Sequence, residues 1–154
     1  GCAADCPQSI AQIAALRAQV AQRLPAGTAL DFVTISLDAA NDTPARLAAL
    51  VAAHDDPSSG VAWYWLTGDP QRIRYVVGGG FELFYREQDG GVAFAPRYVL
   101  VDDLGMIRAR YFTAEPAAEL LQRDINYLIE ERENSRGAGR LAYEAAHLFL
   151  CYPR

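Results

Sequence analysis

The sequence has few of the features that define several common protein classes. Three cysteines in 154 residues are too few for a disulfide scaffold, and they do not form the repeated pairs of a zinc site. No stretch reaches the roughly 18 apolar residues of a transmembrane helix. The glycines at 78–80 follow a predicted helix, and the phosphate-binding motif G-x-x-x-x-G-K-[ST] is absent. These absences argue against a disulfide-rich scaffold, a zinc finger and a P-loop protein.

Excess basic charge is also absent. Fourteen basic residues against nineteen acidic residues give a net charge of -5, and no basic stripe stands out, so we expect no nucleic-acid partner. A hydrophobic content of 51% with 21% charged residues is typical of a globular chain long enough to bury a core. We predict one domain over residues 1–133 and a C-terminal extension over 134–154 that carries a short apolar helix.

The most informative feature present is a close pair of cysteines at the start of the chain. Cys2 and Cys6 are separated by three residues, and Pro7 follows at once. Apolar residues then recur at helical spacing from Ile10 to Leu24, which predicts a helix with proline in its first turn. We therefore expect both thiols at or just before a helix N-terminus.

Two cysteines four positions apart can bring their sulfur atoms together, because one helical turn rises about 5.4 Å. Unpaired N–H groups and the helix dipole favour the thiolate over the thiol at this end. Such a pair can exchange disulfides, be oxidised reversibly or hold Cu(I). A purely structural disulfide, or two inert thiols, is the alternative.

The remaining chain alternates helices and strands, which predicts an α/β fold with a mixed sheet flanked by helices. Beyond the first helix we expect strands at 29–37, 61–66, 81–87, 92–102 and 106–112, and helices at 44–54, 70–77 and 115–133. In such folds a strand normally precedes the helix that carries the site. We expect that strand to be missing from the given chain.

Three motifs in order resemble the Sco/SenC family of the thioredoxin superfamily. The family motif C-x-x-x-C-P matches residues 2–7, and its segment D-x-x-x-D-T-P matches residues 38–44. The stretch Trp-Leu-Thr-Gly at 65–68 is similar to the family's LTG after the next strand. Residues 100–105 resemble its late hairpin turn, so the resemblance covers roughly residues 1–130.

The resemblance implies a thioredoxin-like fold and a place on the periplasmic face of a bacterial cytoplasmic membrane, anchored through segments outside this chain. Relatives bind copper through the two motif cysteines and a histidine. They deliver it to the binuclear copper centre of cytochrome c oxidase, or reduce the cysteines of that centre or of another copper chaperone. Carried over by position, Cys2 and Cys6 take the two cysteine roles, with Cu(I) as the favoured metal.

The third copper ligand of the family has no counterpart in this sequence. Counting back from Gly105, the family's histidine falls at or next to Phe94, and neither Phe94 nor its alanine neighbours can bind a metal. Residues 95–101 instead resemble the proline-plus-strand segment of thioredoxin-like oxidoreductases, in which a cis proline faces the cysteines. Pro96 is therefore a candidate site residue, and an ordinary trans proline beside a strand is the alternative.

Other candidate ligands are sparse. His54 ends a predicted helix, where a solvated terminus accounts for it. His147 and Cys151 are four apart near the C-terminus, a spacing that suits either a metal or a packing face. The preferred hypothesis is a Sco-like protein of oxidase assembly that acts by dithiol exchange, with Cys2 attacking and Cys6 resolving. The alternatives are a copper carrier with a replacement third ligand, and a degenerate thioredoxin-fold subunit kept for protein contacts.

Overall fold

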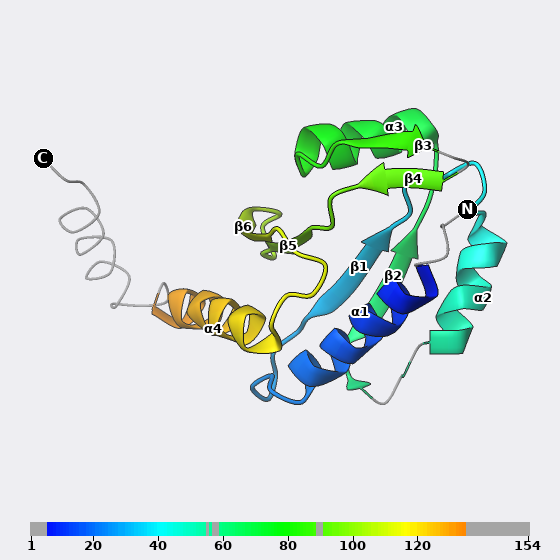
Figure 1. Cartoon of the computed structure of the whole chain (residues 1–154). Helices are drawn as coiled ribbons and strands as arrows, with labels where there is room; N and C mark the ends of the chain where they lie inside the picture. The colour runs from blue at the N-terminus through cyan, green and yellow to red at the C-terminus, as the bar shows by residue number, and fades with distance from the viewer. Residues whose placement is uncertain (1–5, 55, 57–58, 89–90, 135–154) are drawn as a thin grey trace, which may run out of the picture.

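The computed structural model of the chain describes residues 6–54, 56, 59–88 and 91–134 (Figure 1). Helices and strands alternate, so the α/β class is confirmed. The elements in order are α1 Cys6–Ala21, β1 Asp31–Ile35, α2 Pro44–His54, β2 Ala62–Leu66, α3 Pro70–Arg74, η2 Tyr75–Gly80, β3 Tyr85–Gln88, β4 Gly91–Phe94, β5 Tyr98–Val101, β6 Ile107–Tyr111 and α4 Ala118–Asn134.

Helix α1 forms where the apolar spacing predicts it. Ile10, Leu16 and Val20 are buried, and Val20 is 0% exposed. Past Ala21 the chain turns at Gly27, whose φ of 82° lies in the left-handed region that glycine adopts without strain. Helix α1 therefore presents one apolar face to the interior and places its first residue, Cys6, at the opposite end from this turn.

Strands β1 and β2 form a parallel pair, with Phe32 opposite Trp63. Parallel strands need a crossover, and α2 supplies it over the predicted residues. In Figure 1, α1 runs antiparallel to both strands, so its Cys6 end lies at the same edge as their carboxyl ends. This arrangement selects one edge of the sheet as the place where a site can form.

The segment after β2 corrects two predictions. The glycines at 78–80 do not stop the helix at residue 77, because they form the second half of η2, which is a π-helical segment. After it, the Phe81 amide donates a hydrogen bond to the Val76 carbonyl at 3.1 Å. The predicted strand 92–102 is two strands, β4 and β5, with Pro96 in the connection. Proline has no N–H to donate to a ladder, so the chain changes pairing partner there.

The described strands form three two-stranded sheets, where the sequence predicts one mixed central sheet. Strands β1 and β2 are parallel, while β3–β4 and β5–β6 are antiparallel hairpins. The β5–β6 hairpin packs with α1 and α4 around a core that contains Val20, Tyr111 and Ile125. A second core lies under α3 and η2 and contains Ile73, Val77 and Leu83.

Two expectations on the C-terminal end remain predictions. The helix expected near Cys151 lies outside the described residues, and so does any boundary inside the C-terminal extension. Helix α4 runs to Asn134, close to the predicted domain limit at residue 133. Among the described helices, none is long and apolar enough to cross a bilayer.

Candidate dithiol site

The candidate site is built at the N-terminus of α1. Cys6 is the first residue of the helix and Pro7 lies in its first turn, as the sequence predicts. Cys2 lies outside the described residues. The unpaired N–H groups of this turn and the positive end of the dipole face the edge at which β1 and β2 end. A sulfur anion at this edge is stabilised by both effects.

The loop at residues 38–44 follows β1 at the same edge, and Asp42 holds it together. Asp42 is buried (7% exposed), and its carboxylate accepts a hydrogen bond from the Ser36 hydroxyl at 2.6 Å. Its amide donates to the Asp38 carbonyl at 2.8 Å. The cap of α2 is Thr43, whose Oγ1 accepts from the Arg46 amide at 3.3 Å. The motif D-x-x-x-D-T-P is thus a loop that packs its second aspartate inward.

The carboxyl end of β2 carries two polar atoms that the sequence did not single out. Trp65 Nε1 and Thr67 Oγ1 are shielded from solvent and have no hydrogen-bond partner among the described residues. The neighbouring Trp63, by contrast, donates from Nε1 to Thr34 Oγ1 at 2.9 Å. Unpaired buried polar atoms are uncommon in native proteins. These two atoms lie at the carboxyl end of β2, and a strand-end threonine in the LTG motif was the only sequence signal for them.

Pro96 is exposed in the connection between β4 and β5, and its preceding peptide bond is trans, like every peptide bond among the described residues. The cis proline of the similar oxidoreductases is therefore absent. The next residue, Arg97, donates from Nη1 to the carbonyls of Phe81 and Glu82 at 3.0 and 2.8 Å. These bonds anchor the connection to the end of η2. A role for Pro96 beside the thiols stays a prediction.

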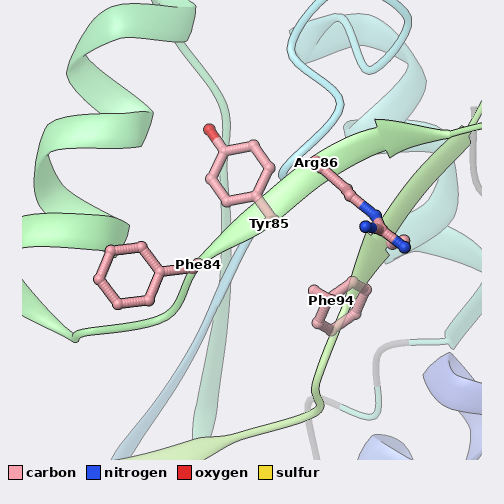
Figure 2. Close-up of a pocket in the computed structure, with 5 residues that line it drawn as sticks. Phe84, Tyr85, Arg86 and Phe94 are labelled. Carbon is pink, nitrogen blue, oxygen red and sulfur yellow. The ribbon is translucent and has the colours of Figure 1, made fainter.

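Phe94, at the position where the family resemblance places an imidazole, ends β4 and is 49% exposed. It lines an open hollow of about 400 Å³ whose walls come from the β3–β4 hairpin (Figure 2). The hollow is lined by Phe84, Tyr85, Arg86, Ala93 and Phe94. No side chain among these is a copper ligand, so the hollow offers a partner only aromatic, aliphatic and cationic surface.

Replacement ligands for copper do not gather in the part of the chain that the structure describes. No group of three His, Cys, Asp or Glu side chains there could hold a metal ion. His54 is the last residue of α2, as predicted. His147 and Cys151 lie outside the described residues, so the replacement-ligand hypothesis for them stays open. The sulfur pair predicted at Cys2 and Cys6 is a donor set of the kind that suits Cu(I).

Helix α1, the parallel strands and the flanking hairpins define a thioredoxin-like α/β protein, with the candidate site at the N-terminus of the first helix. The family model for SCO1/SenC matches residues 1–130. The chain therefore belongs to the SCO1/SenC family, and the resemblance drawn from its three motifs is confirmed.

A solved structure supports the fold. The chain is similar to a SCO1/SenC family lipoprotein from Bacillus anthracis str. Ames, with a TM-score of 0.71 and 23% sequence identity. The match covers 84% of this chain and 76% of that chain. No curated protein matches the sequence. At this identity the likeness establishes the fold, and the chemistry has to be argued from this chain's own residues.

Proposed function

We propose that this protein is a dithiol oxidoreductase of the Sco type, acting on a protein of cytochrome c oxidase copper-centre assembly. The observation that carries the proposal is the position of Cys6, which begins α1 at the edge where β1 and β2 end. The family match includes both motif cysteines, since it spans residues 1–130. A helix N-terminus that stabilises a thiolate supplies the nucleophile for disulfide exchange.

The exchange is a two-electron transfer from the cysteine pair to a disulfide of the partner. The Cys2 thiolate attacks one partner sulfur, forms a mixed disulfide and releases the other partner sulfur as a thiolate, which takes up a proton. The Cys6 thiolate then attacks the Cys2 sulfur and releases the second partner thiol. The products are a Cys2–Cys6 disulfide and a reduced partner, and an external dithiol reductant restores the starting state.

Copper enters the proposal as cargo. Cu(I) accepts two thiolates, and these are the ligands that the family assignment leaves at Cys2 and Cys6. Cu(II) prefers nitrogen donors in tetragonal geometry, and Phe94 offers none at the position of the family's histidine. We therefore propose Cu(I) as the ion held between the sulfurs, with weak retention after oxidation. A periplasmic location, with anchoring outside this chain, accords with the lipoprotein description of the structural neighbour.

The test is reduction of a disulfide-bonded peptide that contains the two cysteines of a binuclear copper centre. Wild-type protein, reduced beforehand, should convert the peptide to its dithiol with one equivalent consumed per disulfide. Cys6→Ser should stop at a mixed disulfide that a mass spectrum detects, and Cys2→Ser should give no reaction. Unchanged reduction by Cys2→Ser would contradict the assignment and favour the degenerate subunit.

Copper retention separates the oxidoreductase from the copper carrier. Titration with Cu(I) against a chromophoric chelator should give one ion per chain, lost in either cysteine variant. The double variant His147→Ala, Cys151→Ser serves as the matched test of a replacement ligand. If the double variant binds Cu(I) as tightly as the wild type, the hypothesis of a copper carrier with a third ligand at His147 or Cys151 is contradicted. A large loss of Cu(I) affinity supports that hypothesis.

A further inference from the structure

The arginines of the chain divide into two groups by their partners. All fourteen basic residues are arginines. Six of those that the structure describes pair with carboxylates: Arg23, Arg46, Arg108, Arg110, Arg123 and Arg132. Four others within the described residues have no carboxylate partner: Arg72, Arg74, Arg86 and Arg97. These four all come from α3, the β3–β4 hairpin and the connection that follows it, in a molecule whose net charge is -5.

The same part of the molecule exposes large aromatic side chains. Phe84 is 82% exposed, Phe112 is 70% exposed and Phe94 is 49% exposed. Exposed apolar patches on a protein surface often mark interaction sites. Aromatic and arginine side chains together are the residues that most often dominate protein interfaces.

Contacts within this region link the cations to the rings. The guanidinium of Arg74 lies 5.1 Å from the centre of the Tyr85 ring, and that of Arg97 lies 4.4 Å from the centre of the Phe112 ring. Arg97 also holds the end of η2 through two carbonyls. We call the six exposed or half-buried side chains that result the hairpin face: Arg74, Arg86, Arg97, Phe84, Phe94 and Phe112.

The hairpin face has a concave centre and free strand edges. The hollow of about 400 Å³ lies between Phe84, Arg86 and Phe94, and Figure 2 shows these side chains projecting from the two strands of the hairpin. Among the described residues, β3 and β4 pair only with each other. An unpaired edge accepts an extended chain by backbone hydrogen bonding, and a hollow beside it takes alternate side chains.

We propose that the hairpin face is the docking surface for an extended, acidic segment of the partner protein, with apolar side chains alternating with carboxylates. Arginine suits carboxylates because its planar fork makes bidentate hydrogen bonds. Arg86 is exposed, and its Nη2 donates to Gln88 Oε1 at 3.1 Å, a neutral amide that leaves the positive charge of the guanidinium in place. The partner is the disulfide substrate that the dithiol chemistry requires, so the inference rests on the proposed function.

The charge distribution also orients the partner. A molecule of net charge -5 repels an acidic segment over most of its surface and attracts it where four arginines lack carboxylates. Such steering acts over about one Debye length, about 8 Å at physiological salt. A flat anionic membrane would satisfy the charge but could not pair with the free backbone edges of β3 and β4, which is why an extended protein segment fits better.

The test uses a fluorescein-labelled peptide that alternates glutamate with phenylalanine and leucine. Anisotropy should show saturable binding that weakens with added salt, while the same peptide with lysine in place of glutamate should not bind. The double variant Phe84→Ser, Arg86→Glu should bind the acidic peptide about tenfold more weakly or worse. Both side chains are exposed, so circular dichroism should show an unchanged fold.

The matched control makes the same kind of change on α4. Tyr127→Ser, Arg132→Glu removes one exposed aromatic ring and reverses one exposed arginine, and its affinity for the acidic peptide should stay within about twofold of wild type. Equal losses in both double variants, or equal binding of the lysine peptide, would overturn the proposal. Binding to vesicles of anionic phospholipid without binding to the peptide would overturn it in favour of a membrane surface.

The result can be separated from the fate of the dithiol proposal. Peptide affinity is measured on protein with both motif cysteines changed to serine, where no exchange can occur. If this serine variant binds the peptide and the wild-type protein reduces no disulfide, the hairpin face is sustained and the proposed chemistry is contradicted. Disulfide reduction without peptide binding would do the reverse.

Discussion

Among single residues, Arg17 shows how one buried cation organises a loop. It is 3% exposed, and its Nε donates to the Val61 carbonyl at 2.8 Å. Its Nη2 reaches the Asp56 carbonyl at 3.0 Å and the Ser59 hydroxyl at 2.8 Å. The guanidinium also lies 5.7 Å from the centre of the Trp63 ring. Helix α1 is thereby attached to the chain that leads into β2.

Replacing Arg17 by methionine keeps much of the side-chain volume but removes the guanidinium donors to three oxygens, and the Val61 carbonyl keeps only the Ser59 hydroxyl as a donor, at 3.2 Å. We expect the free energy of unfolding to fall by about 3 kcal/mol, because several hydrogen bonds from one buried charged group are lost together. Urea denaturation measures this loss. Arg23→Met, which removes an exposed pair with Glu119, should cost less than about 1 kcal/mol. A loss at Arg17 no larger than that at Arg23 would contradict the role given to it.

Tyr111 makes stability depend on pH at the alkaline end. Its hydroxyl donates to Asp124 Oδ2 at 2.8 Å. Burial, followed by the hydrogen bond and the charge of Asp124, raises the pKa of Tyr111 above the ordinary value of 10.0. The folded state keeps the proton after the unfolded state has lost it. This contribution to stability is therefore complete below pH 10 and falls as the pH rises beyond it.

Tyr111→Phe should accordingly lose stability less steeply than wild type between about pH 9.5 and pH 11. Urea midpoints over this range measure the slopes. Tyr127→Phe provides the control, since Tyr127 is 59% exposed and should leave the wild-type slope unchanged. A Tyr111→Phe protein with the wild-type slope would show that another group dominates the alkaline loss.

At the scale of the elements, local capping places the segment that carries the hairpin face. Asp69 precedes α3, and its Oδ1 accepts from the Arg72 amide at 3.0 Å, with Pro70 in the first turn. Asp69→Ala should reduce the free energy of unfolding by about 1 kcal/mol and lower Tm by about 2–4 °C, whereas Asp69→Asn should retain most of the cap. Thermal unfolding followed by circular dichroism compares them. An Asn variant as unstable as the Ala variant would assign the effect to charge instead.

The elements also show how far pattern reasoning reaches. Helix α2 begins at Pro44 and ends at His54 as predicted, because its caps and its apolar spacing are local. The continuation of the helix through the glycines of η2 was not predicted, since glycine usually ends a helix. Here Val77 and Leu83 are buried on either side, and packing holds the glycines in the helix. A strand's partner is a non-local choice, so the split of residues 92–102 was missed as well.

On the scale of the whole molecule, one substitution tests whether the dithiol edge and the β4 strand share a site. Phe94→His restores an imidazole where the family resemblance expects one. If β4 faces the thiols, Cu(II) affinity should rise about tenfold or more and a sulfur-to-copper absorption band should appear. Phe84→His changes another exposed ring of the same hairpin region and should give neither. Equal responses from the two variants would place Phe94 outside the metal site.

The sequence by itself determined the helix that begins at the cysteine motif, the alternation of strands and helices on either side of α2, the three family motifs and the absence of a histidine at position 94. These features follow from spacing and local residue chemistry. Tertiary structure alone decided which strands pair, that Asp42 is buried, that Trp65 and Thr67 lack partners among the described residues, and which arginines are neutralised. Ion pairs such as Arg108 with Glu131 and Arg110 with Glu82 join distant segments. Only the folded chain shows which arginines of the hairpin face lack a carboxylate partner, because charge balance is set by neighbours in space.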